Sequence, residues 1–185
     1  MIKRIIEFLE RNNGFDSVDK EIVEYGLRLG LLELVNTVTI ILIGLVFGMV
    51  AESIIFLLVY IPLRTFVGGY HSRTALLCYL TSILLVSSVL VIVKYFMNFE
   101  LQYYILTVSC LVIIFLSPVE DDNKPLDLVE RKRYKNISVV LLGTVLMVLA
   151  FISFISMYYG YMIIISLSVV SLLALMGYFK NLLGS

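Results

Sequence analysis

The chain has 185 residues, of which 61% are hydrophobic and only 15% are charged, and its mean hydropathy is +1.02. A soluble domain that must keep a wetted surface carries a charged fraction of roughly a quarter, so this composition excludes an ordinary soluble domain and indicates an integral membrane protein. The 14 Lys and Arg residues balance the 14 Asp and Glu residues. The net charge therefore identifies no partner, and the information lies in where the charges stand along the chain.

Residues 1–28 have an amphipathic pattern that predicts helices lying in the membrane interface at the cytosolic face. The apolar residues at helical spacing near the start are Ile2, Ile5, Ile6 and Leu9. Charged residues stand between them, and Asn12-Asn13-Gly14 interrupts the pattern before it resumes. We expect this segment to precede the membrane spans.

Apolar runs between residues 31 and 179 predict an all-α, polytopic membrane protein with about six spans, forming a single domain over residues 1–185. The spans are predicted near Leu31–Met49, Ser53–Leu63, Thr74–Met97, Leu101–Val119, Ile137–Met157 and Tyr161–Phe179. The second is short, because a full crossing requires ~20 residues, and a re-entrant or thin-membrane segment is the alternative. The last two spans come from one uncharged run of 43 residues, for which we predict a hinge near Tyr158–Tyr161.

The basic residues are distributed unevenly across the predicted membrane. Thirteen of the 14 Lys and Arg residues fall on the N-terminal side, and only Lys94 falls on the other. By the positive-inside rule, both termini and the connection from Arg64 to Arg73 face the cytosol. The dense basic run Arg131-Lys132-Arg133 is typical of a cytosolic loop, so nucleic acid is not an expected partner.

One stretch, RTFVGGYHSRTALLC from Arg64 to Cys78, gathers polar residues in this apolar chain and contains the only histidine, His71. A cysteine hydrolase needs a thiol, an imidazole that takes its proton, and donors that stabilise an oxyanion. On one continuous helix His71 and Cys78 would share a face but lie about 10.5 Å apart along the axis, too far for proton transfer. Catalysis therefore requires a break, for which Gly68 and Gly69 offer the backbone freedom.

Each of these residues also has a structural interpretation. A lone interfacial His, a Gly-Gly turn and arginines that anchor helix ends are all common without catalysis. Arg64 is a candidate either for substrate contact or for holding the loop together. Cys78 is expected in the first turns of the third span, where the helix dipole and Arg73 favour a thiolate, whereas Cys110 is interpreted as a small apolar filler. Spacing alone leaves both interpretations open.

The pattern R-x3-G-G-x-H-x6-C resembles the accessory gene regulator B (AgrB) family of Gram-positive bacteria, which are membrane cysteine endopeptidases that process quorum-sensing propeptides. The residues that form it are Arg64, Gly68, Gly69, His71 and Cys78. The chain length, the six-span pattern and the segment from Pro118 to Pro125, followed by a basic run, are similar to that family.

The resemblance implies that Cys78 is the nucleophile and His71 its general base, with Arg64 and Gly69 needed for activity. It further implies that an AgrD-type precursor peptide loses its C-terminal tail through an acyl-enzyme thioester and is cyclised to a thiolactone or lactone. The site is expected at the cytosolic face of a bacterial cell membrane, in a homodimer. We expect no cofactor and no metal, because one His and two Cys cannot build a four-ligand zinc site without carboxylates.

Other polar residues are candidates for supporting roles. Glu33 and Asn36, near the cytosolic end of the first span, are candidates to orient His71, because an ionisable group in a span tends to face a functional interior. For Glu33 the alternative is snorkelling or pairing with Arg28. The basic residues Arg131, Lys132 and Arg133 belong to a loop that is either simply solvated or holds an acidic segment of the precursor.

Two other classes of function remain open from the sequence. A non-catalytic transporter or peptide exporter would line a polar path with Arg64, His71 and Glu33, although the last two predicted spans carry no charge. A structural or docking subunit would need neither His71 nor Cys78.

Overall fold

The computed structural model describes residues 17–70, 74–97, 100–120 and 126–184, and the secondary-structure elements in these ranges are all helices. In chain order they are α2 (Ser17–Phe47), α3 (Val50–Val67), α4 (Ala75–Tyr95), α5 (Gln102–Leu116), α6 (Leu128–Ile155) and α7 (Met157–Gly184). The predicted all-α, polytopic fold is confirmed. Residues 1–16 of the predicted interfacial segment lie outside the described ranges, and residues 17–28 continue directly into the first span as part of α2.

Five of these helices are long and apolar enough to cross a membrane, and α5 is a shorter apolar helix. Their outer faces carry large apolar side chains, including Val46, Leu84 and Phe154, which are 85%, 70% and 93% exposed. Soluble proteins rarely expose apolar surface on this scale, so lipid tails are the natural surroundings of these faces. The chain is a multi-pass membrane protein.

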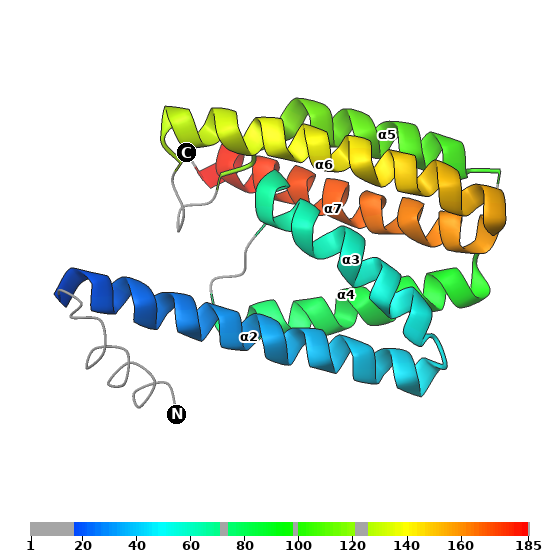
Figure 1. Ribbon diagram of the computed structural model, residues 1–185, viewed down its shortest axis with the longest axis horizontal. Coiled ribbons are helices and arrows are strands. Elements are labelled where there is room, and N and C mark those ends of the chain that lie inside the picture. The colour runs from blue at the N-terminus through cyan, green and yellow to red at the C-terminus, as the bar shows by residue number, and fades with distance from the viewer. Residues whose placement is uncertain (1–16, 71–73, 98–99, 121–125, 185) are drawn as a thin grey trace.

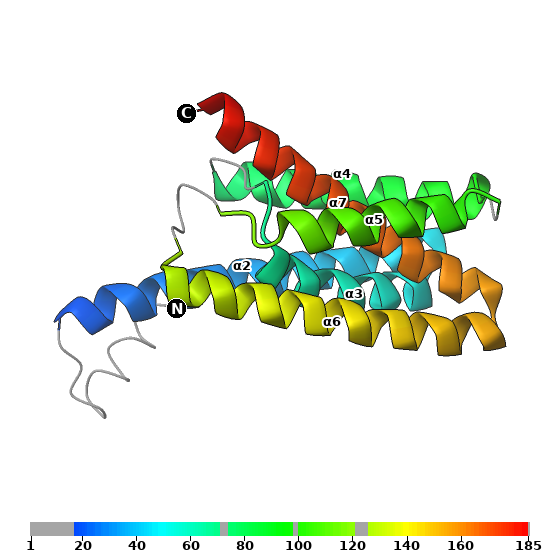
Figure 2. The same ribbon diagram turned by 90° about the horizontal axis from the view of Figure 1, so that it is seen from above.

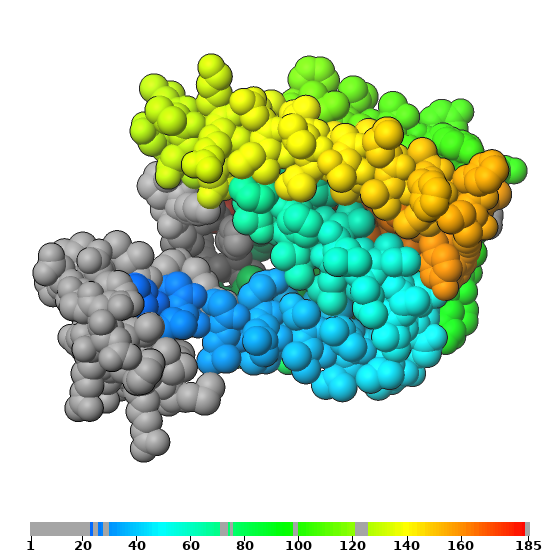
Figure 3. Space-filling model, in the orientation of Figure 1, coloured from blue at the N-terminus to red at the C-terminus, as the bar shows by residue number. Residues whose placement is uncertain are grey.

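Helix α7 lies at the centre of the bundle. It packs against α3, α5 and α6, and 61% of its membrane-spanning stretch is buried, compared with 11% for α2. Figures 1 and 2 show α7 running alongside α5 and α6, and on the face drawn in Figure 3 most of it is covered. Because lipid tails are as apolar as leucine, such burial is stabilised by close van der Waals packing. The side chains on the surface of α7 therefore determine how closely α3, α5 and α6 can pack against it.

The second span is longer than predicted from the sequence. Helix α3 has 18 residues, beginning before Ser53 and continuing past Leu63 and Arg64 to Val67. The prediction ended it at Leu63, where the apolar run stops before the charged Arg64. The helix continues because Arg64 turns its charged group back onto the chain, as described below. α3 is thus long enough to cross, and the short apolar helix is α5 instead.

Two predicted boundaries near α6 were also wrong. Helix α6 begins at Leu128, so the basic residues 131–133 are helical and not in a loop. Its start is set by a capping box in which the Asp127 carboxylate accepts from backbone N–H groups and Glu130 accepts from the Asp127 N–H. The break before the last span is at Ser156, which caps α6, and not at Tyr158–Tyr161.

The six helices alternate in direction, so α2 begins and α7 ends at the same end of the bundle (Figure 1). At this end α3 also finishes, α4 begins, and α5 is connected to α6; we call it the Arg64 end. The opposite end holds a polar contact in which the Tyr158 hydroxyl donates to the buried Glu52 carboxylate at 2.9 Å. There Lys94 donates to the carbonyl of Phe47 at 3.0 Å.

Candidate functional site

The break between α3 and α4 depends on its two glycines. Gly68 and Gly69 have φ angles of 76° and 124°, in the region that side chains with L configuration rarely adopt. A Cβ atom at Gly68 would collide with the carbonyl oxygen of Val119, and one at Gly69 would come within 2.6 Å of the carbonyl oxygen of Leu173. The predicted break is present, and both its conformation and its close contacts require glycine.

Backbone hydrogen bonds hold the segment 67–70 from two sides. The Tyr70 N–H donates to the carbonyl of Leu173 in α7 at 2.9 Å. The Val119 N–H, in the connection between α5 and α6, donates to the carbonyl of Val67 at 2.8 Å. The segment that leads to His71 is therefore fixed against two elements that are distant in sequence.

The side chain of Arg64 holds the same segment through hydrogen bonds to its backbone. Its guanidinium donates to the carbonyls of Gly68 and Tyr70, and it also reaches the hydroxyl of Tyr60, one turn earlier in α3. The sequence left two roles open for Arg64, and these hydrogen bonds support the one in which it holds the loop. A planar guanidinium suits this task because its N–H groups are arranged as a rigid fork.

Cys78 is the fourth residue of α4 and is exposed. Its N–H donates to the carbonyl of Thr74 at 3.0 Å, and the Thr74 side chain caps the helix by accepting from the Leu77 N–H at 3.3 Å. The expected position in the first turn of the third span is confirmed. Arg64 and Glu33 both lie within electrostatic range of its thiol. Cys78 is thus an accessible thiol at a helix start, with one cation and one carboxylate near it.

Helix α2 contributes a polar stripe that faces this site. Glu33 is exposed, and its charge acts on both Cys78 and Tyr60. Thr39, further along the same helix, shares a hydrogen bond of 2.9 Å with the hydroxyl of Tyr79, the neighbour of Cys78. Asn36 lies between Glu33 and Thr39 on the helix, and its Oδ1 atom is buried without a hydrogen-bond partner in the described part of the chain. Such a group costs about 1–3 kcal/mol, so it marks a place where a donor from elsewhere would be stabilised.

His71 and Arg73 lie outside the described residues. The predicted approach of the His71 imidazole to the Cys78 thiol, and the effect of Arg73 on it, therefore remain predictions. The nearest described residues on either side, Tyr70 and Thr74, are anchored as above.

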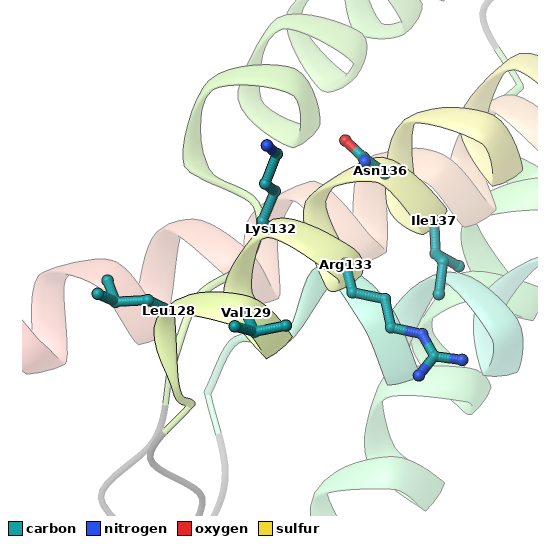
Figure 4. A pocket seen from close by; sticks show the side chains of 6 residues that line it. All are labelled: Leu128, Val129, Lys132, Arg133, Asn136 and Ile137. Carbon is teal, nitrogen blue, oxygen red and sulfur yellow. The ribbon is translucent and has the colours of Figure 1, made fainter.

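The basic residues of α6 form a separate surface at the Arg64 end. Lys132 and Arg133 line a hollow of about 640 Å³ along the first turns of the helix. Figure 4 shows that their side chains point to different sides of the helix. The other lining residues are Leu128, Val129, Asn136 and Ile137. Arg131 instead pairs with Glu120 at 3.5 Å, and no described contact joins this surface to Cys78.

Several residues near the site were missed from the sequence. Tyr60 could have been found, since it stands four residues before Arg64 and so on the same face of α3. Leu173 and Gly177 could not, because they belong to an uncharged span and meet the site only through tertiary contacts. Cys110 packs against the apolar core as expected for a filler. Among the described residues, no three His, Cys, Asp or Glu side chains are grouped as metal ligands would be.

These features define a class: a multi-pass helical membrane protein with an exposed thiol beside an arginine-clamped Gly-Gly break. The sequence model of the family described as Accessory gene regulator B matches residues 2–176. The chain belongs to the AgrB family, as its resemblance indicated.

Similar proteins agree with this assignment. An AgrB-like protein 2 of Clostridium perfringens (strain 13 / Type A) is 30% identical over 139 residues, which cover 71% of this chain and 65% of the relative. The accessory gene regulator protein B of Staphylococcus lugdunensis is 24% identical over 153 residues, covering 82% and 81% of the two chains. The chain thus spans just under two thirds of the Clostridium relative. No solved structure has significant similarity to it.

Proposed function

We propose that the protein is a membrane cysteine endopeptidase that removes the C-terminal tail of an AgrD-type precursor peptide and cyclises the remainder into a quorum-sensing signal. The observation that carries this proposal is the exposed Cys78 in the first turn of α4, next to a break held by Arg64. Membership of the AgrB family supports the substrate class.

In this proposal His71 takes the proton of Cys78, and the thiolate attacks the carbonyl carbon at the cleavage point. The tetrahedral intermediate collapses as the C–N bond breaks, and the imidazolium gives its proton to the departing amine of the tail. A thioester then joins the N-terminal part of the precursor to Cys78. Gly68 and Gly69 allow the chain to place His71 ahead of α4, and Asn36 and Glu33 are the candidates to orient it.

The second half of the reaction is an acyl transfer within the precursor. A thiol or hydroxyl of the peptide attacks the thioester, the C–S bond to Cys78 breaks, and Cys78 recovers a proton. Exchange of one thioester for another is nearly isoenergetic, so a site that excludes water favours cyclisation over hydrolysis. Surrounding lipid at the membrane interface would provide that exclusion.

The remaining expectations on partners belong to the same proposal. The Arg64 end, with both termini, faces the cytosol of a bacterial cell, where the precursor is made. A homodimer in the lipid bilayer stays a prediction from family resemblance, as does the alternative of a non-catalytic exporter.

The test is tail release from a precursor peptide by purified protein in lipid. Cys78→Ala and His71→Ala should slow release by on the order of 10³-fold or more, because each removes a member of one reacting unit. Cys110→Ala is the matched control and should keep the wild-type rate. A covalent peptide adduct on Cys78, and not on Cys110, would add positive support.

The endopeptidase would be excluded by variants of Cys78 and His71 that both release the tail at the wild-type rate. Peptide transport across vesicles without any cleavage by the wild-type protein would favour the exporter.

A further inference from the structure

Gly177, in the last span, touches the backbone of the break before α4. A Cβ atom at Gly177 would lie 2.6 Å from the carbonyl carbon of Gly69, 2.7 Å from its Cα and 2.7 Å from the nitrogen of Tyr70. Cβ atoms do not approach backbone this closely, so any side chain there would displace the segment or α7 itself. The two chain segments lie backbone against backbone only because Gly177 has no side chain.

The same helix turn supplies the hydrogen bond that anchors the segment. Leu173 stands four residues before Gly177, so the two share one face of α7. Its carbonyl accepts from the Tyr70 N–H at 2.9 Å, and a Cβ atom at Gly69 would come within 2.8 Å of its carbonyl carbon. The face formed by Leu173 and Gly177 is therefore a seat for Gly69 and Tyr70.

This seat lies on the most buried helix of the bundle. α7 is packed by α3, α5 and α6, and on the side of the seat Ala174 and Gly177 are buried. A helix held on several sides is a rigid support, whereas the segment resting on it has no regular structure of its own. When the two are forced apart, the segment is the part expected to move.

We propose that Gly177 is a positioning residue for the reaction at Cys78. By admitting Gly69 and Tyr70 to the surface of α7, it fixes the point from which the chain continues to His71, the next residue. It touches neither substrate nor the reacting atoms and acts only through that segment. This inference rests on the proposed function, since it concerns the placement of the general base relative to the nucleophile.

The chain offers a matched control for the key substitution. Gly143, in the membrane-spanning part of α6, is exposed, and a Cβ atom added there would meet nothing within 4 Å. Gly143→Ala thus adds the same methyl group to another span without a collision. Comparing it with Gly177→Ala separates the close contact from the general effect of replacing a glycine in a membrane helix.

The first measurement is steady-state tail release by full-length protein in lipid. Gly177→Ala should lower kcat by about 100-fold, the scale on which a displacement of about 1 Å acts on catalysis, while KM changes little. Gly143→Ala should keep the wild-type kcat. A wild-type kcat in Gly177→Ala would overturn the inference.

The second measurement needs no substrate and reads the coupling between His71 and Cys78. The rate of Cys78 alkylation by iodoacetamide is measured as a function of pH. In the wild-type protein this rate should show a step due to the titration of His71, and the step should be missing in His71→Ala. Gly177→Ala should give the His71→Ala profile, whereas a merely structural role would leave the wild-type profile unchanged. An inactive Gly177→Ala with the wild-type profile would therefore contradict the inference.

Cys110 serves as an internal report on folding, because it is packed against the apolar core. In Gly177→Ala it should stay as protected from alkylation as in the wild-type protein. Reactivity as high as in denatured protein would overturn the inference, since Gly177 would then support the whole bundle. If Cys78→Ala releases the tail normally, the proposed function fails. If only Gly177→Ala does so, this inference alone fails.

Discussion

Arg64 and Asn36 belong to the same candidate site but differ in how their polar groups are satisfied. The Arg64 guanidinium donates to the carbonyls of Gly68 and Tyr70, so it has partners within the chain itself. The Oδ1 atom of Asn36 is buried and has no partner among the described residues. In the proposed function the partner of this acceptor is expected to be His71 or the substrate.

The unsatisfied acceptor makes Asn36→Leu an informative substitution. Removing it relieves a cost of about 1–3 kcal/mol, so the free energy of unfolding should be unchanged or higher. If the acceptor orients His71 or a substrate N–H, kcat for tail release should fall by roughly 10–100-fold, the equivalent of one hydrogen bond of about 1.4–2.7 kcal/mol. Thermal unfolding in lipid and steady-state kinetics on the same sample check both parts.

Thr144→Val is the control for this substitution, because Thr144 is exposed on α6, away from the hollow, and its hydroxyl donates to the Val140 carbonyl of the same helix. It should leave both measurements near wild type. An Asn36→Leu protein with wild-type kcat would show that the buried acceptor plays no part in the reaction.

At the level of whole helices, local sequence signals predict the type of element well and its extent less well. Arg64 ends the apolar run of the second predicted span, although an arginine that can bond its own backbone need not leave the helix. The capping box of Asp127 and Glu130 is visible in the sequence, but the uncharged run from Ile137 placed the predicted start nine residues downstream. Polarity alone does not mark a helix end.

The corrected start of α6 changes what its basic residues can do. Lys132 and Arg133 are part of a rigid helix beside a hollow, and Arg131 is engaged with Glu120. If this surface holds an acidic segment of the precursor, the double variant Lys132→Glu with Arg133→Glu should raise KM by roughly tenfold. Each exposed pair contributes up to about 1 kcal/mol, and reversal replaces attraction with repulsion. The wild-type KM should rise with salt, and that of the variant should not.

Arg131→Gln is the matched control, because its pair with Glu120 is exposed and such pairs contribute about 0–1 kcal/mol to stability. It should change neither KM nor the unfolding temperature appreciably. An unchanged KM in the double variant, at low salt as well as high, would show that Lys132 and Arg133 do not bind the precursor.

For the molecule as a whole, the order of six apolar helices was predictable because hydropathy is a local property of the chain. The position of Cys78 in the first turn of α4 was also predictable, because Thr74 is a good N-cap at the start of an apolar run. The contact of Gly177 with Gly69 was not predictable, since it joins residues more than 100 positions apart and a glycine has no side chain to signal a partner. What the sequence leaves open is how the helices pack, and the site depends on that packing.

The orientation of the bundle is the remaining prediction at this scale. The helices alternate in direction, so the connections fall at two ends, and the basic surface of α6 lies at the Arg64 end while Lys94 lies at the other. An excess of Lys and Arg marks the cytosolic side, because positive charges resist translocation. The Arg64 end is therefore expected in the cytosol, where it can meet a newly made precursor.

Single cysteines in a variant with both native cysteines replaced by Ala can test this orientation. Val129→Cys at the start of α6 and Phe96→Cys at the end of α4 replace exposed side chains at opposite ends of the bundle. A membrane-impermeant maleimide added to intact cells should label Phe96→Cys at once and Val129→Cys only after permeabilisation. The opposite pattern would place Cys78 on the outer face, away from any newly synthesised precursor, and the proposed reaction could not take place there.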